Sequence, residues 1–380
     1  MTISLKKRIK VLIIDDSALI RKVLTGILNS SKNIEVVGTA PDPYIAREKI
    51  KQLNPDVLTL DVEMPKMDGI SFLSNVMRLR PMPVVMISSL TEKGADITLQ
   101  ALELGAIDFI SKPKLDLENG LKAYSEEIIE KIQIAAIANV RYRVLSDKKI
   151  SEKLSADAIL SLKSPRKHFK TTDKIIAIGA STGGTEAIKE ILMSLPVNCP
   201  GVVITQHIPE SFSGPFAERM NRCSPLTVFE ATDGQQILPG HVYIAPGNQH
   251  MVVERSGARY IVKLNDGPPV NRHRPSVDVM FRSISQNVGP NAIGVLLTGM
   301  GTDGALGLKE IHDAGAHTII QDEKSSVVWG MPGEAYKLGA ADKVRPLEDI
   351  PRQIVKTLQI MDTPTDDSAI KSSQLTSANK

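Results

Sequence analysis

The 380-residue chain contains only two cysteines, Cys199 and Cys223, and this scarcity excludes a fold held together by disulfide bonds. It also lacks an excess of charge of one sign, because 46 Lys and Arg against 43 Asp and Glu leave a formal net charge of +3. Such a balance gives no argument for binding to nucleic acid or to an anionic membrane. The first apolar run, residues 11–14, stops at two aspartates, so we expect neither a signal peptide nor direct membrane insertion. These absences predict a cytoplasmic protein.

The composition, with 42% apolar and 23% charged residues, is typical of a globular protein, and the length suits two or three domains. Residues 9–126 alternate short apolar runs with helical patterns such as 18–28 and 44–53. The expected strands are 10–14, 34–38, 57–61, 84–87 and 107–110. This alternation predicts a parallel sheet with helices on both faces.

The rest of the chain divides into three parts. Residues 127–172 begin with a helical pattern and turn polar and basic near 163–167, which predicts an interdomain linker; the alternative is a basic docking segment for a receptor or lipid. Residues 173–360 alternate again, with a β-hairpin expected around Gly257. The expected strands are 174–178, 201–206, 242–245, 251–255, 260–263, 292–297 and 318–321. Residues 361–380 are rich in Ser, Thr and Asp, and we expect them to be disordered.

Carboxylates gather at the predicted strand ends of the first domain. Asp15 and Asp16 end the first strand, Asp61 ends the third, and Glu63 follows two residues later. In a doubly wound sheet these ends share the edge where ligands bind. Because crowded carboxylates repel one another, the arrangement favours a hard divalent cation with oxygen ligands. Taken one at a time, the same residues would be read as solvated helix caps.

Residues 9–126 resemble response-regulator receiver domains. The resemblance rests on VLIIDDS at 11–17, LDVEMPKMDG at 60–69, the serine pair at 88–89 and Lys112 with its following proline. It implies a flavodoxin-like, five-stranded parallel sheet in the order 2-1-3-4-5.

The receiver resemblance also implies roles for single residues. Asp61 would be phosphorylated by a histidine kinase, and Mg²⁺ would be held by Asp15, Asp16, Asp61 and the backbone carbonyl of Glu63. The phosphoryl group would be followed by the Ser88 hydroxyl and bound by Lys112, and Phe109 would move with the switch. A phosphoryl group adds charge and acceptor oxygens around which such groups can reorder.

A glycine-rich turn, GASTGG at 179–184, follows the apolar run 175–178 and precedes a helical pattern. Such a turn can expose a nucleophilic serine, here Ser181, or cradle a phosphate. A dinucleotide site needs an acidic residue about 20 positions later, at the end of the next strand. Here His207 stands at that strand end, which favours a general base over a nucleotide site.

Asp303 lies in a third turn with several glycines, just after the apolar run 294–297. Alone, His207 would be an ordinary hydrogen-bonded residue and Asp303 a helix cap. Together, Ser181, His207 and Asp303 at three strand ends predict acyl transfer, with a nucleophile, a general base and an orienting carboxylate. The order Ser…His…Asp differs from that of ordinary α/β-hydrolases.

Residues 173–360 resemble the catalytic domain of the chemotaxis protein-glutamate methylesterases. The matching stretches are 178–184, 206–209, 245–250, 274–278, 297–304 and 330–332. The resemblance implies a doubly wound, mostly parallel α/β catalytic domain without a cofactor, in which Met300 contributes a backbone N–H to the oxyanion hole. It further implies hydrolysis of glutamate 5-O-methyl esters on chemoreceptor cytoplasmic helices, release of methanol, and deamidation of receptor glutamines. The receiver would dock over the Ser181 edge and block it.

Other interpretations stay open. The C-terminal domain would be catalytically idle if it only bound a partner, whereas a transcription factor is disfavoured because no helix-turn-helix pattern follows residue 130. His250, His273 and His312 lack the spacing of a metal site, so structural or surface roles are expected. Residues 274–278 are expected to line the substrate cleft or to cap a helix.

Overall fold

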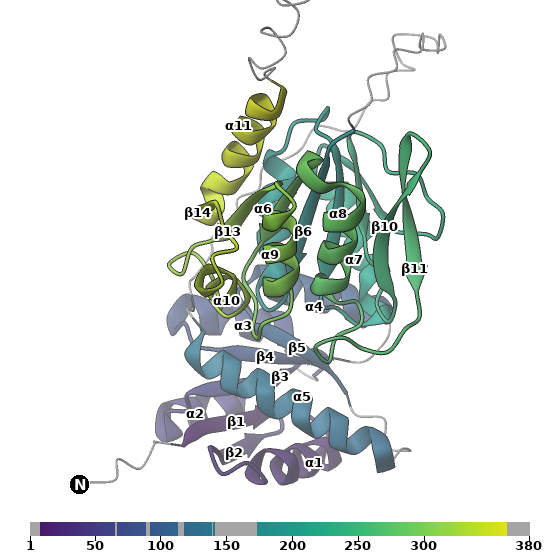
Figure 1. Ribbon diagram of the computed structural model, residues 1–380. Helices are drawn as coiled ribbons and strands as arrows, with labels where there is room; N and C mark the ends of the chain where they lie inside the picture. The colour runs from purple at the N-terminus through teal and green to yellow at the C-terminus, as the bar shows by residue number, and fades with distance from the viewer. Residues whose placement is uncertain are drawn as a thin grey trace, which may run out of the picture.

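The computed structural model describes residues 8–64, 67–88, 92–112, 118–138, 140 and 173–362. Two α/β units lie one above the other in Figure 1, with the N-terminal unit in purple and blue and the C-terminal unit in teal to yellow. Within the described residues, no helix has both the length and the apolar character that crossing a membrane requires.

The N-terminal unit is a five-stranded parallel sheet in the order β2-β1-β3-β4-β5, which confirms the predicted fold. Its strands are β1 (Ile9–Ile14), β2 (Ile34–Ala40), β3 (Val57–Asp61), β4 (Val84–Ser88) and β5 (Asp108–Ser111). Its helices are α1 (Ala18–Asn29), α2 (Pro43–Leu53), α3 (Gly69–Leu79), α4 (Glu92–Glu103) and α5 (Glu118–Ile137). Ser17, Asp42 and Asp68 cap the first three helices by accepting a backbone N–H three residues on.

Helix α5 crosses the predicted domain boundary. The receiver was expected to end at residue 126, but the helix continues without a break to Ile137. Ile128, Ile132 and Ala135 are buried against the receiver sheet, so this segment belongs to the receiver core. We therefore place the end of the receiver after Ile137. The remainder of the predicted linker, residues 141–172, lies outside the described residues.

The C-terminal unit is a seven-stranded sheet in the order β14-β13-β12-β6-β7-β9-β8, and every pairing within it is parallel. Its strands are β6 (Ile175–Ala180), β7 (Gly201–Gln206), β8 (Thr227–Glu230), β9 (His241–Ile244), β12 (Ala292–Leu296), β13 (His317–Gln321) and β14 (Lys343–Arg345). The predicted hairpin forms from β10 (His250–Ser256) and β11 (Arg259–Asn265) as a separate antiparallel pair, with Gly257 at φ 62° in its turn.

Helices cover both faces of this sheet, as expected for a doubly wound domain. They are α6 (Gly184–Ser194), α7 (Glu210–Cys223), α8 (Val277–Asn287), α9 (Ala305–Asp313), α10 (Met331–Lys337) and α11 (Ile350–Asp362), with 3₁₀ turns at Gly289–Asn291 and Leu347–Asp349. Buried residues of α8, α9 and α10 share one apolar cluster with the hairpin, whereas those of α6, α7 and α11 belong to the other. Because α11 runs to Asp362, only residues 363–380 of the predicted tail remain, and these lie outside the described residues.

Candidate active site

Three neighbouring central strands, in the order β12-β6-β7, carry the residues that the sequence singled out. Ser181 follows β6, His207 follows β7, and Asp303 lies between β12 and α9. Because all three strands are parallel, their carboxyl ends meet at one edge of the sheet. The predicted convergence of these residues at a single sheet edge is therefore present in the structure.

The turn that carries Ser181 depends on its glycines. Gly183 has a φ of 77°, a backbone conformation that L side chains rarely adopt. A Cβ on Gly184 would lie 2.2 Å from Gln206 Oε1, so the turn and the end of β7 can approach only without a side chain there. The Gln206 amide then donates from Nε2 to Ser181 O at 2.9 Å. These contacts fix the serine backbone against the end of β7, the strand that precedes His207.

A chain of hydrogen bonds joins the three side chains. His207 Nδ1 lies 3.1 Å from Ser181 Oγ, and His207 Nε2 lies 2.8 Å from Asp303 Oδ2. Since an ionised carboxylate only accepts hydrogen bonds, Asp303 holds the imidazole proton on Nε2 and leaves the Nδ1 lone pair free for the serine proton. The nitrogens have the opposite assignment to the trypsin-type triad, in which Nε2 faces the serine. The sequence could not have indicated this difference.

Asp303 is 2% exposed and lies at the amino end of α8. Val277 N donates to Oδ2 at 2.7 Å, and Ser276 Oγ donates to Oδ1 at 2.7 Å. Burial alone would raise the pKa of Asp303, but hydrogen bonds from His207, Asn271 and Ser276 hold it well below its usual range. Helix N–H groups and the helix dipole favour the charged form as well. Asp303 is therefore ionised at neutral pH and suited to stabilise an imidazolium.

Met300 was predicted to supply an oxyanion-hole N–H. It lies in the turn after β12, where Gly299 N donates to Val328 O and Gly330 N donates to Gly299 O. Among the described residues, the Met300 N–H has no acceptor, as a donor reserved for a substrate oxyanion requires. In the same region, Ser181 N donates to Thr298 O at 3.1 Å and ties the nucleophile turn to this one.

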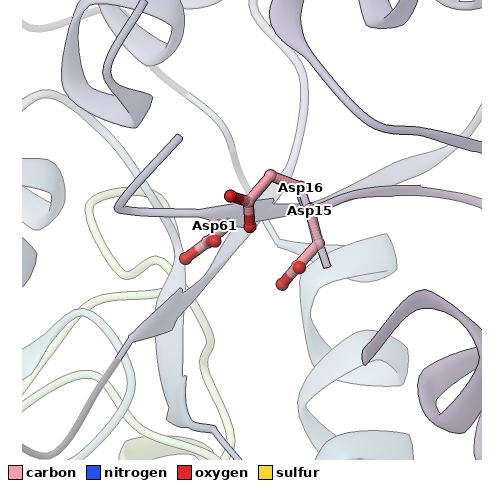
Figure 2. Close-up of side chains that lie close together, drawn as sticks. All are labelled: Asp15, Asp16 and Asp61. Atoms are coloured by element: carbon pink, nitrogen blue, oxygen red, sulfur yellow. The ribbon is translucent and has the colours of Figure 1, made fainter. Parts of the chain in front are cut away.

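The receiver carries a second polar cluster. Asp15, Asp16 and Asp61 present carboxylate oxygens that lie within 4.8 Å of one another at the ends of β1 and β3 (Figure 2). Lys112 donates from Nζ to Asp61 Oδ2 at 2.8 Å and lies 3.9 Å from Asp15 Oδ2. Burial raises the pKa of Asp61 to about 6, with the nearby Asp15 adding to it and Lys112 opposing it.

This cluster fits a divalent cation such as Mg²⁺. Asp15 Oδ2 is buried and, in the described part of the chain, accepts no hydrogen bond, so it has capacity for a ligand. Hard carboxylate oxygens are what Mg²⁺ prefers. Glu63 N donates to Asp61 Oδ1 at 3.2 Å, which places the loop carrying the predicted carbonyl ligand beside the cluster.

The predicted switch residues occupy distinct places. Ser88 is fully buried, and its Oγ donates to Gly94 O at 3.2 Å, so following a phosphoryl group requires that bond to break. Phe109, also buried, lies 4.4 Å from the ring of Phe212 on α7, measured between centroids. The receiver aromatic residue thus packs directly against the catalytic unit.

Further contacts cross between the two units. Thr182, the residue after Ser181, donates from Oγ1 to Asp108 Oδ2 at 2.7 Å. Glu103 on α4 forms ion pairs with Lys189 on α6 and Arg219 on α7. Figure 1 places α4 and β5 on the side of the receiver that faces the catalytic unit. Docking of the receiver over the Ser181 edge was expected from the family resemblance, whereas none of these individual contacts could be predicted from the sequence.

We expect the receiver to bind Mg²⁺ about four times more weakly at pH 5.5 than at pH 7.5, because protons compete for a carboxylate whose pKa is about 6. The affinity for Mg²⁺ falls as the pH falls, because acid protonates Asp61 and a neutral carboxyl group is a poor ligand. Titration calorimetry with MgCl₂ at the two pH values measures the ratio. As a control, Asp61→Asn should bind more weakly throughout and show less pH dependence. Equal affinity of the unaltered chain at both pH values would contradict this expectation.

The fold and the two clusters define a class: a response regulator whose receiver is joined to an α/β domain with serine-hydrolase geometry. The model of the CheB methylesterase family matches residues 176–354, and the response regulator receiver domain model matches residues 11–124. A protein-glutamate methylesterase/protein-glutamine glutaminase of Hydrogenovibrio crunogenus is 59% identical, with 93% of this chain and 99% of that protein covered. A protein of the same name, numbered 1, from Geobacter metallireducens is 57% identical, with 92% and 96% covered.

Two solved structures are also similar. The Thermotoga maritima CheB methylesterase catalytic domain is 37% identical, with a TM-score of 0.48, and covers 48% of this chain and 98% of its own. The response regulator domain of Thermotoga maritima CheB is 44% identical, with a TM-score of 0.32, and covers 35% and 99%. On the identity and coverage of the full-length relatives, the chain belongs to the CheB family of receiver-linked protein-glutamate methylesterases.

Proposed function

We propose that this protein hydrolyses glutamate 5-O-methyl esters on chemoreceptor cytoplasmic helices, releases methanol, and deamidates receptor glutamines. The observation that carries the proposal is the hydrogen-bonded chain Ser181–His207–Asp303 at three adjacent strand ends. The two full-length relatives, at 59% and 57% identity, bear names that include both activities. A cytoplasmic location stays a prediction.

In the acylation half-reaction, Ser181 Oγ attacks the ester carbonyl while its proton passes to His207 Nδ1. Asp303 stabilises the imidazolium through its bond to Nε2. The carbonyl oxygen becomes an oxyanion, for which we assign the Met300 N–H as donor. When the tetrahedral intermediate collapses, the carbon–oxygen bond to the methoxy group breaks, and the Nδ1 proton leaves with it as methanol. The product is an acyl-serine.

Deacylation repeats these steps with water. His207 Nδ1 accepts a proton from the attacking water, and the Ser181 oxygen departs with that proton, which releases glutamate. A glutamine side chain follows the same route, with ammonia as the first leaving group in place of methanol. One oxyanion geometry therefore serves both substrates.

We assign phosphorylation of Asp61, with a histidine kinase as donor, as the control of this reaction. Mg²⁺ held by Asp15, Asp16, Asp61 and the Glu63 carbonyl would offset negative charge during the transfer. In the unphosphorylated chain, the Thr182–Asp108 bond and the Phe109–Phe212 contact hold the receiver beside the nucleophile. Reordering of Ser88, Phe109 and Lys112 around a phosphoryl group loosens these contacts and opens the Ser181 edge.

The alternative, an idle domain that only binds a partner, predicts an unreactive serine. We expect a fluorophosphonate probe to label the chain covalently at Ser181, because His207 activates this hydroxyl. Gel fluorescence and peptide mass spectrometry identify the labelled residue, and His207→Ala should reduce the labelling rate at least about 100-fold. An unlabelled chain, or labelling that persists in Ser181→Ala, would favour the idle domain.

A further inference from the structure

A tight turn at residues 270–273 lies against the triad, although its residues are absent from the mechanism above. Val270 and His273 exchange two backbone hydrogen bonds, of 3.0 and 2.9 Å. The two residues between them, Asn271 and Arg272, both have positive φ, of 52° and 68°. This is the pattern of a two-residue hairpin turn of type I′, in which both central residues are left-handed. Such a turn fixes the directions of its side chains closely.

The Asn271 side chain lies between two carboxylates. Its Nδ2 donates to Asp303 Oδ1 at 2.7 Å and to Asp278 Oδ2 at 2.7 Å. An amide nitrogen has two hydrogens, so each carboxylate receives one. Both carboxylates are buried, and burial raises the pKa of Asp278, with the charge of Asp303 contributing. Asn271 therefore bridges two groups that would otherwise repel each other.

His273 covers the ring of His207. The two imidazoles are stacked with their centroids 3.6 Å apart and their planes 11° from parallel. Burial, followed by the proximity of His207, lowers the pKa of His273 to about 3, so its ring is neutral at neutral pH. A flat ring against His207 restricts rotation of the imidazole. Because the His273 ring is neutral, it does not repel the positive charge that His207 carries during turnover.

We propose that Asn271 and His273 are positioning residues for the reaction: one turn holds Asp303 through an amide bridge and His207 through a ring stack. Neither side chain touches the reacting atoms, and both act through the general base and its carboxylate. The inference rests on the proposed function, because it assumes that His207 and Asp303 act as that function assigns.

Several charged or titratable groups surround His207 and enter any pH dependence. Asp303 faces Nε2, His273 stacks on the ring, and Asp278 lies behind Asn271. Arg272 from the same turn and Lys131 from α5 of the receiver are close enough to influence His273. A substitution at Asn271 or His273 that keeps these other groups in place therefore measures the contribution of that one residue to the pH dependence.

Loss of the amide should change the pH profile as well as the rate. Asn271→Gly removes the side chain but suits a left-handed backbone position, so the turn remains. We expect its kcat to fall about 10- to 100-fold with KM unchanged, because a small misplacement of a catalytic pair has effects of this size. With one donor fewer, Asp303 attracts the imidazolium more strongly, so the acid limb of kcat/KM moves to higher pH. Asn271→Asp should be more severe, because a third carboxylate joins the cluster.

The stack is tested by two substitutions at one position. His273→Phe keeps a flat, uncharged ring and should retain kcat within a few-fold with the acid limb in place. His273→Ala removes the ring and hydrates His207, so we expect kcat to fall about tenfold and the acid limb to move to higher pH.

The experiment measures methanol release from methylated receptor membranes by full-length variants between pH 5.5 and 9, together with thermal melting and the rate of fluorophosphonate labelling. Correctly melting Asn271→Gly and His273→Ala chains with unaltered kcat and acid limb would overturn the proposal. A His273→Phe chain as impaired as His273→Ala would overturn the stacking role. If a glycine or alanine variant melts at a lower temperature, the rate of fluorophosphonate labelling at a temperature where it is folded takes the place of kcat, and an unaltered labelling rate and pH profile would overturn the proposal. Failure of the proposed function is distinguishable, because the unaltered chain would then release no methanol.

Discussion

Replacement of Ser181 by alanine should lower methanol release from methylated receptors by about 10⁴-fold or more, as loss of a triad nucleophile does in other serine hydrolases. The substitution removes the oxygen that lies 3.1 Å from His207 Nδ1, and no other nucleophile is held at that position in the described structure. Binding and oxyanion stabilisation survive, so any residual rate reports those terms alone. Gas chromatography of released methanol, with receptor membranes in excess, measures the effect.

A matched control uses a serine away from the site. Ser285, on α8, donates its hydroxyl to Arg282 O, and Ser285→Ala should release methanol at the unaltered rate. Ser181→Ala should also melt like the unaltered chain, because within the described residues the bond to His207 is the only hydrogen bond that the Ser181 hydroxyl makes. Full activity in a well-folded Ser181→Ala chain would refute the assignment of the nucleophile.

The positions of Ser181, His207 and Asp303 could be predicted because each follows a strand that is fully buried and mainly apolar. Parallel strands buried on both faces read as continuous apolar runs, and their ends are then visible in the sequence. The two edge strands of the catalytic sheet gave no such signal. Strands β8 (Thr227–Glu230) and β14 (Lys343–Arg345) were missed, because the first alternates between exposed and buried and the second has three half-exposed or exposed residues.

The surroundings of the site depend on contacts between residues far apart in the chain. Residues 274–278 were expected to line a cleft or cap a helix, and Ser276 is indeed the N-cap of α8, but its hydroxyl donates to Asp303. His273 was expected to have a structural or surface role, and its stack on His207 has no counterpart in local sequence. Periodicity reports which face of an element is buried but not which side chain of another element lies opposite.

The contact between receiver and catalytic unit centres on a carboxylate with two cations. Glu103 is 12% exposed, and its partners Lys189 and Arg219 are 22% and 19% exposed. Burial alone would raise the pKa of Glu103, but hydrogen bonds from Arg219 and Lys189 lower it below its usual value. The arrangement in which the two units are in contact, called the closed state below, therefore stabilises the charged form of Glu103. Removal of one member of such a group leaves the other charges partly buried and unpaired.

We therefore expect Glu103→Gln to raise the basal rate of methanol release about tenfold without any phosphodonor. A loss of roughly 1.4 kcal/mol from the closed state raises the ratio of open to closed molecules tenfold, and a partly exposed ion pair of this kind supplies about that much. Methanol release before and after addition of a small-molecule phosphodonor provides the measurement, and the stimulation should shrink because more molecules are already open before the phosphodonor is added.

The control for that experiment is Glu35→Gln, which removes a charge of the same sign from an exposed pair with Arg8, within the receiver. It should leave both the basal and the stimulated rates unchanged. A shortened chain without residues 1–140 lacks the whole receiver, including α5. It should match or exceed the basal rate of Glu103→Gln. If both chains fold and neither exceeds the unaltered basal rate, the receiver does not restrain Ser181, because loss of the contacts at Thr182, Phe212 and Glu103 would then leave access to the nucleophile unchanged.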